Sequence, residues 1–449
     1  MNSEGKREVW IDWMRAIACF MVMIVHSTEP FYLGGDGGQI LTESDMYWAA
    51  FFDSAVRMCV PLFVIASSYL QFPLHCSTTD FFRRRAVRIL VPFAVWSLVY
   101  ALYWGEPAEN LKGLLFNFNY AAGHLWFVYM LIGVYLIMPM LSPWAEKVGK
   151  KELKVYIGIW LFTTTFPMLR DCLTSGDLPL IIGQTGLPRQ AIYPLWGEAS
   201  WNGNGTFYYM YGFMGYLLLG LYFRRFAKVE SWVKTLAIAL PAYLVGFGIT
   251  FGGFVRRVLE MCGGNFPACG GLEKAVWWET TWTNDTLGVA LMTIGMVMMM
   301  RKFTASGTIY RKVLLPISKA SYGMYLAHML VLSVFSEFYR NWLGIAGEGA
   351  FGGYWWLPKI KEFPIVFYTE NQLLTKTCPK VGSSRGTKMG QNLLKTYLAI
   401  FFHDVHVIKD LCYSFAKVHN YSETNEGNPL NLSFAVHFSS TCTDNGIFG

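Results

Sequence analysis

The first apolar segment of the chain carries two residues that could do chemistry, Arg15 and His26. They lie eleven residues apart, which in a helix is three turns plus about 20°, so both side chains share one face about 16 Å apart. Imidazole titrates near neutrality and can act as a general base, whereas guanidinium stays charged and binds phosphate bidentately. Ionisable groups at membrane depth are costly unless they are paired or hydrated. The pair therefore indicates a reaction site or a pathway.

Structural roles compete with this interpretation. Asp12 lies on the same helical face and could simply neutralise Arg15, whose long side chain could also reach the nearby membrane boundary. A single histidine near a helix end, such as His26, is often a hydrogen-bonded core group. The pattern alone leaves these alternatives open, more so for Arg15 than for His26.

The composition predicts a membrane protein. Of the 449 residues, 53% are apolar and only 15% are charged, which is less charge than soluble domains carry. We therefore expect an all-α class, a polytopic bundle of membrane-spanning helices. Nine spans are readable, at 9–28, 46–72, 87–104, 124–143, 154–170, 206–224, 232–252, 282–300 and 317–337.

Basic residues set the expected orientation. The net charge is +7, but Lys and Arg cluster in every second connection between apolar segments, as topology signals do, so no nucleic acid is expected as a partner. Connection 28–45 has no Lys or Arg, whereas Arg256, Arg257 and Lys274 weaken the contrast in a later loop. The pattern places the amino terminus in the cytoplasm. The longest outer loop, about 171–205, suits a substrate vestibule or an ordinary surface loop equally.

The residues after Phe351 change in character. Lys, Asn, Thr, Ser and half of the eight histidines appear there, without a full-length apolar segment. We expect a membrane domain over 1–351 and an atypical polar tail over 352–449 that is disordered or non-native, as a change of reading frame would leave.

Cysteine and histidine usage suggests little further chemistry. Cys262 and Cys269 lie in a predicted outer loop, where an oxidising compartment would allow a disulfide but does not require one. The tail histidines His403, His406 and His419 are scattered and non-periodic, so no metal site is expected.

Several segments together resemble one family. Arg15, ten intervening residues and His26 resemble the Arg/Lys-x10-His signature of the acyltransferase-3 family of integral-membrane acyltransferases. The segment RMCVPLFVIASSYL resembles that family's second span, with Arg57 and Pro61 in place and Ser68 where Gly is usual.

Further blocks follow in the family's order. RRRAVRILVPF contains Arg85-x-x-Arg88 and resembles the basic entry to the third span. HLWFVYMLIGVYLIMPML, with His124 and Trp126, is similar to the family's His-Leu-Trp-Phe helix, and TFYYMYGFMGYLLLG at 206–220 resembles its sixth span.

The last block is SKASYGMYLAHMLVL, in which Tyr322, Tyr325 and His328 resemble the family's S-x-G-I-Y-x-x-H segment. The six blocks cover about 340 residues. The nearest subgroup resembles bacterial O-acetyltransferases of the enterobacterial common antigen type. The family's tenth helix has no recognisable counterpart after residue 351.

The resemblance implies an enzyme, a membrane-embedded O-acyltransferase of the bacterial inner (plasma) membrane. It would move an acyl group, usually acetyl, from cytoplasmic acetyl-CoA to a hydroxyl of a cell-envelope carbohydrate or lipid-linked glycan. Acyl-CoA, the glycan and the lipid bilayer are then its partners, and no cofactor is bound permanently.

The resemblance also implies roles for residues. His26 would be the general base, and Arg15, with Arg85 and Arg88, would hold the donor's phosphates or stabilise developing negative charge. The remaining candidates would line the substrate cavity: Asp12, Arg57, His124, Trp126, Tyr322, Tyr325 and His328.

Two alternatives remain open. Ionisable residues in broken helices also form the path of a proton-coupled secondary transporter of a small envelope precursor, although no repeat relates the two halves of the chain. A non-enzymatic scaffold or sensor would tolerate replacement of Arg15 and His26.

Overall fold

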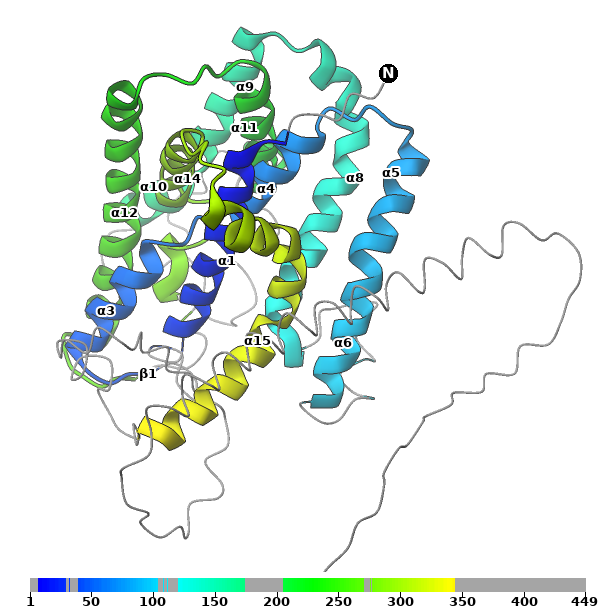
Figure 1. Cartoon of the computed structure of the whole chain (residues 1–449). Helices are drawn as coiled ribbons and strands as arrows, with labels where there is room; N and C mark the ends of the chain where they lie inside the picture. Colours follow the sequence, from blue (N-terminus) through cyan, green and yellow to red (C-terminus); the bar gives the residue numbers. More distant parts are fainter. Residues whose placement is uncertain are drawn as a thin grey trace, which may run out of the picture. The chain divides into compact units, whose positions relative to one another are not determined.

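The computed structural model describes residues 7–29, 32, 39–103, 108, 111, 120–173, 205–269, 275 and 277–343, all within one compact unit, Met1–Thr375. In these residues the architecture is helical (Figure 1), apart from one antiparallel pair of two-residue strands, β1 (Gln39–Ile40) and β2 (Ala268–Cys269). The expected all-α class is confirmed for this part of the chain.

The helical elements are α1 (Val9–Thr28), α3 (Glu43–Ser54), α4 (Cys59–Gln71), α5 (Thr78–Arg85), η1 (Ala86–Leu90), α6 (Val91–Tyr103), η2 (Tyr120–Leu125), α8 (Trp126–Lys147), α9 (Lys150–Thr163), α10 (Phe166–Leu173), η3 (Gly205–Met210), α11 (Phe213–Arg225), α12 (Trp232–Cys262), η4 (Glu279–Thr281), α14 (Leu287–Met300), η5 (Tyr310–Leu314) and α15 (Leu315–Leu343). The elements η1 and η5 are single π turns, and η2, η3 and η4 are 3₁₀ turns.

Length and composition make five segments of the described chain candidates to cross a membrane: Val9–Thr28, Glu43–Gln71, Thr78–Tyr103, Gly123–Lys147 and Trp232–Cys262. The other four expected spans stay predictions: three correspond to shorter or interrupted helices, and 317–337 corresponds to the 29-residue α15, which is not among the five. One of these, α14, is apolar but only 14 residues long.

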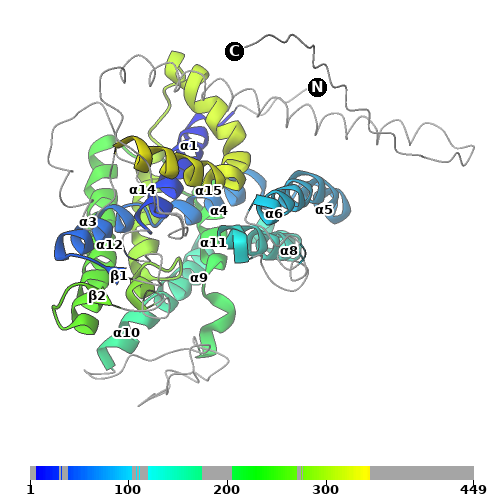
Figure 2. The ribbon, with the colours of Figure 1, turned by 90° about the horizontal axis from the view of Figure 1, so that it is seen from below.

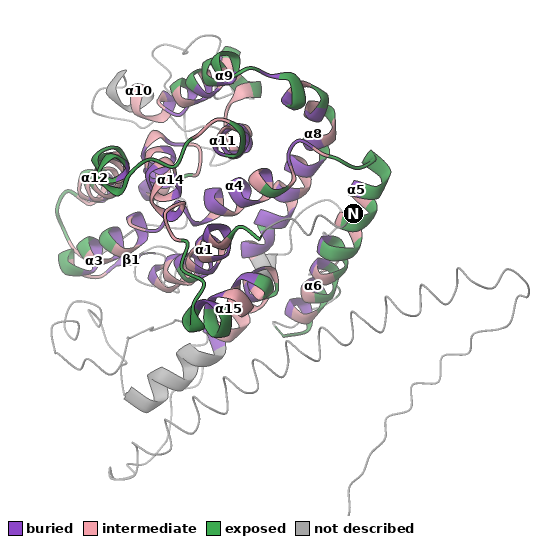
Figure 3. Ribbon diagram, turned by 45° about the horizontal axis from the view of Figure 1, so that its top comes forward, coloured by how far each residue is buried: buried purple, intermediate pink, exposed green. Residues whose placement is uncertain are grey.

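Exposed apolar surface supports the membrane assignment. Only 22% of the most apolar stretch of α12 is buried, and 28% of that in Thr78–Tyr103, against 56% in α1. Figure 3 shows long exposed faces on α5, α6 and α12. Such faces would be unfavourable in water but are what contact with lipid requires.

The second expected span is broken into α3 and α4 by the turn 55–58, which carries Arg57. Backbone that leaves the helix at membrane depth is tolerated where protein covers it or where it lines a cavity. Pro61 lies in the first turn of α4, where a missing N–H removes no helical hydrogen bond. The break therefore places a charged side chain inside the bundle.

Helix α1 is central to the packing. Figures 1 and 2 place it beside α4 and α15, and it packs against both. Close packing elsewhere depends on small residues: a Cβ added to Gly246 of α12 would lie 2.4 Å from the carbonyl oxygen of Gly288 in α14. Ser68, where the family usually has Gly, donates from Oγ to the Leu217 carbonyl at 2.6 Å, and Gly220 leaves room for it.

Two expectations about loops have different outcomes. Cys262 is a free thiol, so the disulfide considered between Cys262 and Cys269 is not formed. The tail 352–449 and nearly all of loop 171–205 lie outside the described residues.

Candidate active site

Hydrogen bonds between polar side chains join α1 to the start of α15. Asp12 is buried and receives hydrogen bonds from Arg7, Tyr310 and Ser318, at 2.6 and 2.8 Å, 2.7 Å and 2.6 Å respectively. The carboxylate of Asp12 is thus paired with Arg7. Its charge also acts on Arg15, as expected, whereas Arg7 and α15 enclose it and it does not border the cavity described below.

Arg15 lies one turn further along α1. Its Nη2 donates to Ser321 Oγ at 2.6 Å. Tyr135 of α8 is close enough to interact electrostatically with Arg15 and with Arg85. The guanidinium of Arg85 lies 5.2 Å from the centroid of the Tyr135 ring, and Arg88 of η1 is exposed. Tyr135 therefore lies near both Arg15 and Arg85.

His26 makes an ion pair at the other end of α1. Its Nδ1 lies 2.9 Å from Glu29 Oε2, one turn later. A carboxylate only accepts, so Nδ1 carries the hydrogen, and the Nε2 of a neutral His26 is left as a base. Burial alone would raise the pKa of the Glu29 carboxyl, but the charge and hydrogen bond of His26 and the charge of Arg57 hold that pKa below its ordinary value. Glu29 is thus ionised at neutral pH and orients the imidazole.

Replacing Glu29 with Gln should lower the rate of any reaction in which His26 is the base by about 10- to 100-fold, because an amide can donate to Nδ1 and favour the wrong tautomer. Turnover by the purified variant measures this loss. Since the pKa of Glu29 is lowered, the stabilisation it gives is present at neutral pH and is lost only on acidification below the ordinary carboxyl range. Equal rates in E29Q and the wild type at neutral pH would contradict this role.

A second charged group lies beside this pair. Arg57, in the break between α3 and α4, makes an ion pair with Asp53 and donates to Tyr32 Oη at 3.2 Å. Its guanidinium stacks on the Trp282 ring, 4.4 Å from the centroid. Tyr32 in turn donates to Glu279 Oε1 at 2.6 Å. Burial raises the pKa of the Glu279 carboxyl, although Arg57 opposes that change.

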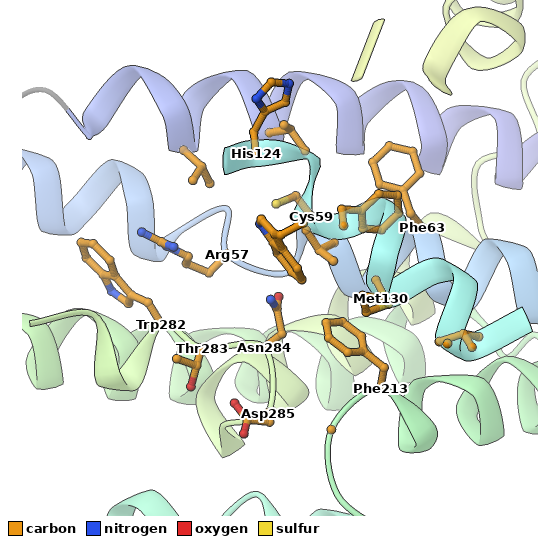
Figure 4. Close-up of a pocket in the computed structure, with 18 of the residues that line it drawn as sticks. Arg57, Cys59, Phe63, His124, Met130, Phe213, Trp282, Thr283, Asn284 and Asp285 are labelled. Atoms are coloured by element: carbon orange, nitrogen blue, oxygen red, sulfur yellow. The ribbon is translucent and has the colours of Figure 1, made fainter. Parts of the chain in front are cut away.

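Both groups border one cavity of about 720 Å³. His26, Glu29, Arg57 and Glu279 line it, together with aromatic and polar side chains from η2, α8, α11 and the segment before α14. Figure 4 shows Arg57, Trp282, Thr283, Asn284 and Asp285 toward one side and Phe63, Met130 and Phe213 toward the other. The cavity thus has a polar part and an apolar part.

The other expected cavity residues lie around the same space. His124, Trp126 and Tyr325 line the cavity, and Tyr325 Oη donates to the His124 carbonyl. His328 borders a small adjoining void instead, and the Oη of Tyr322 donates to the Ile89 carbonyl at 3.0 Å. Of the residues expected at the site, six are not among those that border this cavity: Asp12, Arg15, Arg85, Arg88, Tyr322 and His328.

Several of these residues were missed in the sequence. Glu29 could have been found, because a carboxylate three residues after a histidine lies on the same helical face, and Asp53 stands in the same relation to Arg57 at four residues. Glu279 and Trp282 carry no such local signal, since they lie more than 200 residues away along the chain.

The apolar helices and the buried histidine–carboxylate pair beside a cavity define a membrane protein with a potential acid–base site. A family model described as an acyltransferase domain matches residues 8–367, and the chain belongs to this acyltransferase-3 family. No curated protein and no solved structure matches the chain significantly. The protein is therefore a membrane acyltransferase, which disfavours the transporter and scaffold alternatives.

Proposed function

We propose that this protein is an O-acyltransferase that moves an acyl group, most simply acetyl, from cytoplasmic acyl-CoA to a hydroxyl of a cell-envelope carbohydrate or lipid-linked glycan. The observation that carries the proposal is the His26–Glu29 pair at the edge of the cavity. A hydroxyl is a weak nucleophile at neutral pH and needs a base in contact with it. His26 is placed to be that base, because its side chain is 16% exposed and lines the cavity.

The reaction then needs no further group to remove a proton. The acceptor hydroxyl gives its proton to Nε2 of His26 while its oxygen forms a bond to the thioester carbonyl carbon. The tetrahedral intermediate loses the thiolate of the coenzyme, and the proton on His26 passes to that sulfur. The apolar side chains at one side of the cavity suit an acyl group, and the polar side suits a carbohydrate.

Arginines toward the other end of α1 from His26 suit the phosphates of the donor. Guanidinium binds phosphate bidentately, and Arg15, Arg85 and Arg88 lie at the end of the bundle that the distribution of basic residues assigns to the cytoplasm. This orientation puts the amino terminus in the cytoplasm of a bacterium whose inner membrane holds the protein. The subgroup that acts on the enterobacterial common antigen remains the nearest proposal for the acceptor.

Arg15→Gln and Arg85→Gln should each raise the KM for acetyl-CoA by about tenfold, because each removes a charge-assisted hydrogen bond to phosphate. The KM for the acceptor should stay unchanged. Lys151→Gln, an exposed cation on α9, is the matched control. Donor KM values equal to that of the control would contradict the donor role of both arginines.

Deletion of the gene tests the acceptor class. Mass spectrometry of envelope glycans from the deletion strain should show loss of a mass equal to one acyl group, and expression of the gene should restore it. Expression of His26→Gln should not restore it. Identical glycan masses with and without the gene would contradict a carbohydrate acceptor. Truncation after residue 351 in the same strain tests the proposal that the tail contributes neither folding nor catalysis.

A further inference from the structure

Three histidine rings from three separate elements meet beside the cavity. His328 of α15 lies between the other two, with ring centroids 4.9 Å from His26 and 5.0 Å from His124. The rings of His26 and His124 are 6.5 Å apart. No other cluster of three histidine rings occurs in the described part of the chain. Of these three residues, only His26 has a role in the reaction proposed above.

Two of the rings have their Nδ1 fixed by an acceptor. The partners are the Glu29 carboxylate for His26 and the Tyr325 carbonyl for His328. Carboxylate and carbonyl oxygens cannot donate, so the hydrogen of each of these two rings, when neutral, lies on Nδ1 and its Nε2 is a bare lone pair. In His124 it is likewise Nε2 that has no hydrogen-bond partner.

Two of these lone pairs are enclosed without a donor. His124 and His328 are 7% and 2% exposed, and the Nε2 of each has no hydrogen-bond partner. An enclosed acceptor without a partner is unfavourable, and its persistence in a structure calls for a reason. The tyrosines in contact with these rings do not donate to either Nε2. Tyr100 donates to the Leu326 carbonyl and Tyr325 donates to the His124 carbonyl.

A metal ion does not supply the reason either. The described residues include no group of three His, Cys, Asp or Glu side chains that could hold one.

The charged groups that face the cluster are Glu29 at the end of α1, Asp53 on α3, Arg57 in the following turn and Glu279 on η4. The three carboxylates favour a positive charge on His26.

We propose that the bare Nε2 atoms of His124 and His328 stabilise the imidazolium that His26 becomes when it takes the acceptor's proton. The proposal rests on the proposed function of His26 as base. In the resting enzyme the two lone pairs are unsatisfied. When His26 Nε2 gains its proton, a positively charged ring stands with its centroid 4.9 Å from that of His328 and 6.5 Å from that of His124, and the lone pairs of the two neutral rings interact favourably with that charge. His124 and His328 are then positioning residues that hold the proton on His26 until it returns to the thiolate.

The test distinguishes the effect of the Nε2 lone pair from the effect of the shape of the ring. His328→Phe and His124→Phe keep an aromatic ring but remove the acceptor, whereas His328→Gln and His124→Gln keep an acceptor oxygen that does not titrate. Diethyl pyrocarbonate, which reacts with neutral imidazole, is applied to the purified full-length protein over a range of pH. Mass spectrometry then gives the rate of modification at His26, a readout that requires no acyl transfer.

A loss of stabilisation makes His26 give up its proton at lower pH. We expect the midpoint of modification at His26 to fall by about one pH unit in each Phe variant, as expected when one charge-assisted hydrogen bond is lost. The Gln variants should shift by less than half as much. The acid limb of the acyl-transfer rate should move in the same direction and by the same amount. His75→Phe, at an exposed histidine of the α4–α5 connection, is the matched control.

Unchanged midpoints in both Phe variants would overturn the proposal, as would equal shifts in Phe and Gln variants. Where a Phe variant does not elute as a folded protein, the smaller His328→Leu and His124→Leu repeat the test. If the modification midpoints shift but the protein transfers no acyl group, the role of the cluster in stabilising the proton on His26 is supported. The proposed acyltransferase reaction is then wrong.

Discussion

Replacement of His26 with Gln should lower acyl transfer by about 10²- to 10⁴-fold, because the acceptor hydroxyl loses the base that takes its proton. Gln keeps a hydrogen-bonding side chain of similar length in the α1 position, so binding of both substrates should change little. The loss should therefore appear in kcat and leave the donor KM near the wild-type value. Turnover with labelled acetyl-CoA measures both constants.

The control for this prediction is His75→Gln. His75 is exposed on the connection between α4 and α5 and lies away from the cavity. A protein with H75Q should turn over at the wild-type rate. If H26Q retained more than about a tenth of the wild-type kcat, another group would be the base, and the role assigned to the His26–Glu29 pair would be wrong.

Replacement of Arg57 with Ala should destabilise the protein by about 3–5 kcal/mol, because it leaves the carboxylate of Asp53 buried without its counterion. The side chain of Asp53 is 0% exposed, and that of Arg57 is 14% exposed. The variant also loses the stacking of the guanidinium on Trp282. The midpoint of denaturant-induced unfolding in detergent micelles gives the change in free energy.

A double variant separates charge from packing. In Asp53→Asn combined with Arg57→Gln neither position of the ion pair is charged, so the loss of stability should be smaller than in Arg57→Ala alone. Arg256→Ala, in an exposed i, i+4 pair with Glu260, is the matched control and should change stability by less than about 1 kcal/mol. A loss in R57A no larger than that in R256A would show that Asp53 does not depend on its partner.

The local geometry of the candidate site could be predicted from the sequence. Arg15 and His26 share one helix, so their common face follows from the period of an α-helix, and Arg57, His124 and Tyr325 were placed near the site by resemblance. Partners from distant segments could not be predicted. Ser321 contacts Arg15, which lies 306 positions earlier in the chain, because α15 packs against α1, and no local pattern specifies that contact.

The helix count was harder to predict for a physical reason. Apolar segments were expected to be continuous spans, but some are divided by turns, such as the turn carrying Arg57 and the turn between α9 and α10. Hydropathy does not distinguish a continuous helix from a broken one, because both bury apolar side chains. The turn between α3 and α4 is also where Arg57 enters the site, and His124 enters it from η2.

The most direct test of the account uses full-length protein purified in lipid nanodiscs. Acetyl-CoA with a labelled acetyl group is added with a lipid-linked envelope glycan, and the label on the glycan and the free thiol of the coenzyme are both measured. We expect label on a glycan hydroxyl and one equivalent of thiol for each acetyl transferred. Both the label and the thiol release should be lost in His26→Gln. Thiol released without labelled glycan, or labelling that persists in H26Q, would contradict it.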